Sequence, residues 1–449
     1  MTRRLGTRVS SRLTNVPRHE RFALPNGLQV LLAPQSSSPT ASVWVWYRVG
    51  SKNEWPGITG ASHWVEHMLF QGSPKYPKGE TDRAIVAVGG SLNAFTDTDF
   101  TAYLNIVPRE YLDLPLAIEA DRMTRALIAP KEVERERTVI HSEREGNENW
   151  PEFRAEEELY SLAFRFHPYR WDPLGRRVDI EQLTAEQLQT YYHRFYGTKN
   201  ALLVVTGGFD LRSTRREIQR RFSSLPSGGD DPTVRIVEPP ARGERRSRLT
   251  GPGTTPLLEI GWRSPALPDP ETPATMLLDV LLGGEARLFS AGAGWGRSAE
   301  HPSSRLYRAL VEPGLAVRAS SMWRPRLHPG LFTIGAQAAP GVSIERLERA
   351  VDEVIERFIR LGPTALEMAD ARAKVIRGAA LAYEGATRTA FRLGYFATLN
   401  AGDVERQLLR NILKTSAAAT RSRARELFRP ESRTTVIYEP KGGPGAGSD

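Results

Sequence analysis

The chain has 449 residues, of which 40% are hydrophobic and 25% charged. This length exceeds one ordinary hydrophobic core, so we expect two domains or two duplicated halves. The absence of cysteine excludes disulfides and thiolate catalysis and removes Cys as a metal ligand, so we expect any metal site to use His, Asp or Glu. The net charge of +9 comes mostly from arginines spread along the chain, a distribution that does not indicate a nucleic-acid-binding protein.

The N-terminal twenty residues are rich in Arg and Ser and carry no acidic residue before Glu20. They also lack the apolar stretch of a secretory signal, so we expect a basic, poorly ordered tail and a cytoplasmic location. No apolar run approaches the roughly 18–20 residues that a membrane span requires. We therefore expect no membrane-spanning segment.

The first half opens with strands and continues with helices. Residues 22–34 place an Asn-Gly turn between two apolar runs, which predicts a hairpin. A strand is predicted next at 42–50, and a long strand region at 91–107. The expected helices and the last strand of this half follow in chain order: helices at 61–70, 80–88, 110–128 and 131–149, a buried strand at 201–209 and a closing helix at 211–225.

The second half repeats this outline of strand, helix, strand pair and long helix. Its predicted elements are a strand at 256–267, a helix at 271–284, a strand pair within 314–340 and an amphipathic helix at 343–362. The sequence thus predicts an α+β protein of two similar duplicated domains, each a mostly antiparallel sheet with helices packed on it. We place the domains at 1–227 and 251–449, with a linker at 228–250 that is rich in Gly, Pro, Asp and Arg.

Residues 63–67 read His-Trp-Val-Glu-His within an otherwise apolar stretch. Positions i and i+4 of a helix share a face, so His63 and His67 can hold one ion with two imidazoles. Glu66 lies within about 100° of that face and can reach a water on the ion without ligating it. The pattern is the inverted form of the H-E-x-x-H zinc helix, and it predicts a metal site.

A catalytic zinc needs three protein ligands and one open position, so a third ligand is required. In the helix predicted at 131–149, Val133, Glu136, Ile140 and Glu143 recur on one face. Carboxylates on a buried face need a cation, which a metal ion would supply. The spacing alone does not decide between Glu136 and Glu143 as the third ligand.

Several blocks carry a resemblance to a known family. They are GITGASHWVEHMLFQGSPKYPKG, GGSLNAFTDTDFTAYLNIVP and ERERTVIHSEREGNENWPEF, with further matches at 167–175, 194–210 and 303–316. From Phe22 to about Tyr438 the chain resembles the pitrilysin/insulinase family of zinc metallopeptidases, the inverzincins. It is most similar to the short-chain branch that holds the beta subunit of the mitochondrial processing peptidase and bacterial zinc-bearing subunits. The resemblance implies a two-domain chain that forms half of a clam-shell chamber.

The resemblance also implies roles for particular residues. It implies one Zn²⁺ per chain, held by His63, His67 and Glu143, with Glu66 as general base. Glu136 matches a second glutamate that supports the catalytic site. The segment that would align an extended peptide substrate as an added strand contains Asn93, Ala94 and Phe95.

The sequence departs from the family pattern in the second half. Many active members carry an Arg and a Tyr that grip the substrate, whereas the aligned positions here are Val311 and Val317. The nearby Arg305 and Tyr307 do not have the family spacing, and we interpret them as helix packing. We therefore expect a zinc-dependent endopeptidase subunit in a heterodimer with a related chain that lacks the zinc site and supplies the missing pair, a homodimer also being compatible. The alternative is a non-catalytic structural or assembly subunit of the same fold.

Overall fold

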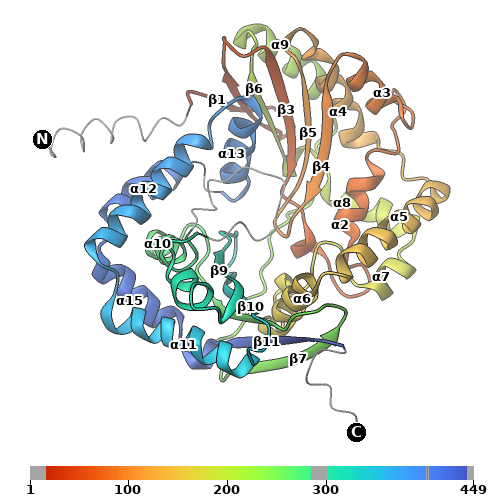
Figure 1. Cartoon of the computed structure of the whole chain (residues 1–449). Helices are drawn as coiled ribbons and strands as arrows, with labels where there is room; N and C mark the ends of the chain where they lie inside the picture. Colours follow the sequence, from red (N-terminus) through yellow and green to blue (C-terminus); the bar gives the residue numbers. More distant parts are fainter. Residues whose placement is uncertain (1–16, 285–300, 401, 403, 442–449) are drawn as a thin grey trace, which may run out of the picture.

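A computed structural model of the chain describes residues 17–284, 301–400, 402 and 404–441. The chain forms two halves, each a sheet with helices packed against it (Figure 1). Most of the basic N-terminal tail and most of the Gly-, Ala- and Ser-rich segment at 285–302 lie outside the described residues.

The first half contains a six-stranded sheet in the order β1-β2-β6-β3-β5-β4. Its strands are β1 (Glu20–Ala23), β2 (Gln29–Pro34), β3 (Thr40–Tyr47), β4 (Ser91–Thr96), β5 (Thr101–Pro108) and β6 (Ala201–Gly207). Its helices are α2 (Ala61–Met68), α3 (Glu80–Ala87), α4 (Asp113–Arg125), α5 (Pro130–Glu148), α6 (Pro151–Ala163), α7 (Arg177–Gln182), α8 (Ala185–Phe195) and α9 (Leu211–Phe222). The predicted hairpin is confirmed, with Gly27 of the Asn-Gly turn at a φ of +94° between β1 and β2.

The second half contains a five-stranded sheet in the order β7-β11-β8-β10-β9. Its strands are β7 (Arg245–Gly251), β8 (Leu257–Arg263), β9 (Ala316–Trp323), β10 (Leu331–Ala338) and β11 (Thr434–Pro440). Its helices are α10 (Thr272–Gly283), α11 (Ile344–Leu361), α12 (Ala365–Leu381), α13 (Ala386–Thr398), α14 (Val404–Lys414) and α15 (Ala417–Leu427), with a short π-helix at Tyr307–Val311.

The two sheets have the same topology once β1 is set aside. In each sheet one pair is parallel, β2 with β6 and β7 with β11, and the remaining neighbours are antiparallel. The edge strand β4 of the first sheet corresponds to β9 of the second, and α2 corresponds to α10 in chain order. The predicted fold class, two similar α+β domains, is thereby confirmed.

Each half also packs one helix against the sheet of the other half. Helix α13, from the second half, lies against β3 and β6 of the first sheet (Figure 1). Its backbone comes so near that a Cβ on Gly394 would lie 2.1 Å from Nε1 of the buried Trp46. In the opposite direction, α6 packs against β8 and β11, with Leu159 against Gly261. This exchange ties the two halves together.

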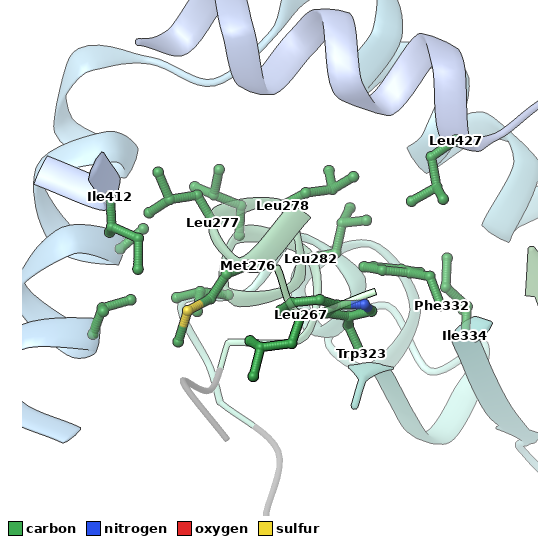
Figure 2. Packing of buried hydrophobic residues seen from close by; sticks show 14 of the residues in the cluster. Leu267, Met276, Leu277, Leu278, Leu282, Trp323, Phe332, Ile334, Ile412 and Leu427 are labelled. Carbon is green, nitrogen blue, oxygen red and sulfur yellow. The ribbon is translucent and has the colours of Figure 1, made fainter. Parts of the chain in front are cut away.

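The apolar side chains form layers on both faces of each sheet. In β3, Val43 and Val45 face the helices of their own half, whereas Trp44 and Trp46 face α13, as the strand alternation requires. In the second half, α10 is buried almost throughout and lies between the sheet and the helices α14 and α15. Figure 2 shows the apolar side chains around α10, among them Met276, Leu278, Trp323, Phe332 and Ile412.

One expected boundary differs from the observed elements. Residues 245–250, which we placed in the linker, belong to β7, which pairs in parallel with β11. The apolar pattern did not reveal this strand, because its exposed positions carry arginines that form ion pairs with other elements. Arg246 is paired with Glu348 and Arg248 with Glu439. The connection without strand or helix runs from 226 to 244.

Candidate metal centre

Helix α2 presents the predicted ligands because its first turn is fixed by a carboxylate. Gly60 takes a left-handed conformation at the helix start, with a φ of +91°. The Glu54 carboxylate accepts hydrogen bonds from the amides of Gly60 and Ser62, at 2.7 and 2.8 Å. These amides have no partner within the helix, so Glu54 caps the helix. The rest of α2 is held by Trp64 and Val65, which are fully buried.

Helix α5 brings the distant glutamates to α2. It begins at Pro130, a residue whose fixed φ suits the first helical position. Val133 and Ile140 are buried, as the stripe predicted, and Glu136 and Glu143 lie on the same face toward α2.

Three ligand atoms converge in the geometry of a metal site. His63 Nε2 and His67 Nε2 are 3.3 Å apart, and Glu143 Oε2 lies 3.5 Å from the first and 3.6 Å from the second. Three corners of a tetrahedron around zinc, with bonds of about 2.0–2.2 Å, are roughly 3.3–3.6 Å apart. The triangle therefore fits a tetrahedral zinc with these three ligands. Among the described residues it is the one group of three or more such side chains close enough to share an ion.

Glu136 takes a different position from Glu143. Its Oε2 lies 3.2 Å from His67 Nδ1, the nitrogen that faces away from the triangle, and its Oε1 accepts a hydrogen bond of 2.7 Å from Gln71. A carboxylate on the second nitrogen of a ligating imidazole orients the ring and raises its basicity. The arrangement thus gives Glu136 a supporting position rather than a ligating one. His63 Nδ1, by contrast, is buried with no hydrogen-bond partner among the described residues.

Glu66 is buried beside the ligands and is held by the edge strand. Its Oε2 accepts a hydrogen bond of 2.5 Å from the Thr96 hydroxyl of β4. Burial raises the pKa of Glu66 to about 7, because the effect of burial is larger than the opposing effect of the Thr96 hydrogen bond. In the metal-free chain this carboxyl can therefore both accept and return a proton near neutral pH.

The two histidines differ in electrostatics in the metal-free chain. Burial lowers the pKa of His63 to about 4. Burial also acts to lower the pKa of His67, but its hydrogen bonds with Glu136 and Glu143 outweigh that effect and raise the pKa to about 9. The Glu136 and Glu143 carboxylates thus stabilise a positive charge at His67. A divalent cation held by the triangle would be attracted to the same carboxylates.

The predicted peptide-binding segment lies at the edge of the first sheet. Strand β4 pairs with β5 alone, which leaves its other edge without a strand among the described residues. Asn93 is exposed, and Ala94 is buried on the α2 side of the sheet. Phe95 faces the opposite side and packs edge-on against Trp44 and Trp46.

Three supporting residues were not found from the sequence. Thr96 could have been located by strand alternation, since it shares a face with Ala94 and therefore with α2. Gln71 could have been located because it stands four residues after His67. Glu54 gave no local signal, because it acts across a turn of irregular backbone.

In the second half, Arg305 is used for packing. It makes two hydrogen bonds to Glu367, at 2.8 and 2.9 Å, and lies over the ring of Phe358. Val311 ends the π-helix, and Val317 on β9 is half exposed. The interpretation of Arg305 as helix packing agrees with these contacts.

Comparison with known proteins assigns this chain to a family of peptidases. A family model described as Insulinase (Peptidase family M16) matches residues 29–173, and one described as Peptidase M16 inactive domain matches 182–375. The helix with His63, Glu66 and His67 and the helix with Glu143 both lie within the first match. The chain belongs to the insulinase family, peptidase family M16, as the sequence resemblance indicated.

Individual relatives agree with this assignment. The zinc protease PqqE of Helicobacter pylori is 28% identical over 349 residues, which cover 76% of this chain and 75% of that protein. The probable mitochondrial-processing peptidase subunit beta of Arabidopsis thaliana is 25% identical over 273 residues, or 60% of this chain and 51% of that protein. The crystal structure of a protease from Helicobacter pylori superposes with a TM-score of 0.88 at 25% identity, covering 94% of this chain and all of that one.

Proposed function

We propose that this chain is a zinc-dependent endopeptidase subunit that cleaves extended peptides. The observation that carries the proposal is the triangle of His63 Nε2, His67 Nε2 and Glu143 Oε2, whose edges fit tetrahedral zinc. The His67 and Glu143 side chains are 21% and 41% exposed, so solvent and substrate can reach the ligands. A closed structural site would need a fourth protein ligand, and the described residues place no other His, Asp or Glu in this group.

Each residue of the site has a role in this proposal. His63, His67 and Glu143 would hold zinc, which would act as a Lewis acid and lower the pKa of a water to about 7. Glu66 accepts the proton of the attacking water and gives it to the leaving amine nitrogen. Thr96 keeps the Glu66 carboxylate oriented through its hydrogen bond. Glu136 holds the His67 ring by its second nitrogen.

The substrate would bind along β4 as an added strand. Main-chain hydrogen bonds from 93–95 would hold an extended peptide, and such pairing reads backbone rather than side chains. We therefore expect broad sequence preference, with Asn93 and Ala94 next to the peptide. Phe95 would support the strand from the opposite face, where it packs against the two tryptophans.

A partner chain would complete the substrate grip. The second half carries Val311 and Val317 at the positions aligned with the Arg and Tyr of many active members, and Arg305 is engaged with Glu367. One relative is named a subunit beta. We propose a heterodimer with a related chain that lacks the zinc helix and provides the pair, and a homodimer is the competing arrangement. Co-expression with such a chain is expected to raise peptide cleavage well above that of the isolated chain, which strong cleavage by the isolated chain would contradict.

The function is tested by replacing the proton carrier. Glu66→Gln keeps the shape of the side chain but cannot carry the proton. Purified wild type and variant should contain the same amount of zinc, while the variant loses at least about a hundredfold in peptide cleavage. Undiminished cleavage by the variant would remove Glu66 from the mechanism. Inactive wild-type chain that holds zinc, even with its partner, would instead favour the non-catalytic assembly subunit.

A further inference from the structure

The turn that joins β4 to β5 is buried between the two halves of the chain. It consists of residues 97–100, directly after Thr96. Asp99 is only 4% exposed and Asp97 is partly buried, so two carboxylates lie where water is scarce. Burying a carboxylate costs several kcal/mol unless it is paired or hydrogen-bonded, so the residues around this turn must supply such partners.

Contacts within the first half hold the main chain of this turn. The buried ammonium of Lys52 donates to the main-chain oxygen of Asp99, and the amides of Ser51 and Lys52 bond the main-chain oxygens of Asp97 and Thr98. Gly50 lies so near that a Cβ there would be 2.2 Å from the Asp97 oxygen. These contacts fix one side of the turn.

The other side of the turn is held by the second half. The loop between β9 and β10 (residues 324–330) places the Leu327 amide 3.0 Å from Asp99 Oδ2. Tyr169, from the first half, donates to Asp99 Oδ1 at 2.7 Å and accepts from the His328 amide at 3.0 Å. Arg326 lies 3.6 Å from Asp97 and stacks over Tyr169.

The same turn leads directly into the proposed site. One residue before it, Thr96 binds Glu66, and the preceding residues form the free edge on which a peptide would pair. A shift of the turn would therefore move both the Glu66 hydrogen bond and the edge. Neither the zinc ligands nor their helices α2 and α5 contribute to the contacts that hold the turn.

We propose that the second half positions the substrate-binding edge of the first half, acting through the 324–330 loop on Asp99. This inference rests on the proposed function for its kinetic consequence, although the coupling itself is structural. The half that matches an inactive domain thus has a task in the site without carrying zinc. Asp99, Arg326 and Tyr169 are positioning residues, because they act through β4 and do not touch the zinc ligands.

The test replaces one oxygen acceptor by a donor. In full-length zinc-loaded protein, Asp99→Asn keeps the side-chain shape but leaves either Tyr169 or the Leu327 amide without its acceptor. We expect unchanged zinc content and a rise of about tenfold in KM for an extended peptide, from loss of a charged hydrogen bond. We also expect a smaller fall in kcat, of about two- to threefold, because the Thr96–Glu66 hydrogen bond moves with the turn. Simple loss of folded protein would lower the apparent kcat and leave KM unchanged.

A matched control separates positioning from stability. Arg305→Met removes a second-half arginine whose contacts are with Glu367 and Phe358 rather than with the turn, so it should lower the melting temperature without changing KM. Tyr169→Phe is a second, conservative variant that removes both hydroxyl bonds and should repeat the KM effect if Asp99→Asn does not fold. An unchanged KM in the folded variants, or an equal rise in the Arg305→Met control, would overturn the inference.

Hydrogen exchange tests the inference without requiring activity. In metal-free protein, the amides of β4 and β5 should exchange faster in Asp99→Asn than in wild type, and should be unchanged in Arg305→Met. Unaltered exchange in Asp99→Asn would overturn the coupling. If the wild type cleaves no peptide, the proposed function fails on the Glu66→Gln comparison, while exchange still decides this inference.

Discussion

At the scale of single residues, the two glutamates that α5 brings to the candidate site take different positions. Glu143 Oε2 faces the Nε2 atoms of both histidines, whereas Glu136 meets the far nitrogen of His67. The periodicity of α5 predicted that both would lie on one face, and they do. It could not separate their roles, because the choice depends on which turn of α5 crosses α2. That crossing is set by tertiary packing rather than by spacing.

The division of roles predicts different losses of zinc affinity. Glu136→Gln should weaken zinc binding about 10–100-fold, the usual effect of losing a carboxylate behind a ligating imidazole. Glu143→Gln should weaken it more, because a ligand is replaced by a poorer one. Glu145→Gln, on the same helix but paired with Arg177 at the surface, is the control and should change nothing. Zinc titration by calorimetry measures all three, and a larger loss in Glu136→Gln would exchange the two roles.

At the scale of elements, local pattern predicted the helices and strands better than their surroundings. Helix α2, the buried face of α5 and the β1–β2 hairpin follow from residues close in sequence, so they could be predicted directly. The cap from Glu54 and the bond from Thr96 to Glu66 depend on contacts between segments, and β7 was obscured by arginines whose partners lie on other elements. Charge pairing across elements is invisible to a pattern that counts apolar positions.

The cap of α2 gives stability a defined dependence on pH. Glu54 is fully buried, and this burial raises its pKa to about 7 despite the bonds from Gly60 and Ser62. The folded-state pKa of Glu54 exceeds the unfolded value of about 4.3. The stabilising contribution of Glu54 is therefore complete below a pH of about 4.3 and is lost as the pH rises through about 7. In metal-free protein, wild type should lose up to about 3 kcal/mol relative to Glu54→Gln between pH 5 and 8. Urea unfolding at pH 5 and pH 8 measures the free energy of unfolding of both proteins. A wild type that keeps or gains stability relative to Glu54→Gln as the pH rises would contradict this prediction.

At the scale of the whole molecule, the two halves are duplicated but not independent. The sequence indicated the duplication through repeated element order. It gave no sign that α6 and α13 each cover the sheet of the other half, because an amphipathic helix does not specify which apolar face it will meet. The buried contacts of Asp99 with the 324–330 loop are a second tie between the halves.

This exchange predicts that neither half folds alone. A chain of residues 1–227 would leave β3 and β6 without α13, exposing Trp44 and Trp46, and would leave α6 without its sheet. Such a fragment should aggregate or bind a dye for exposed apolar surface. Co-expression with 228–449 should restore a soluble complex. A monomeric, cooperatively unfolding 1–227 fragment would contradict the account.

The central claim is that two imidazoles and the Glu143 carboxylate hold one zinc and leave a position for water. X-ray absorption at the zinc edge of the purified protein tests it most directly. We expect one zinc per chain, bound by two nitrogens of histidine and by oxygens of one carboxylate and one water, at about 2.0–2.2 Å. A spectrum with a third histidine or four protein ligands, or protein that takes up no zinc at neutral pH, would contradict the claim.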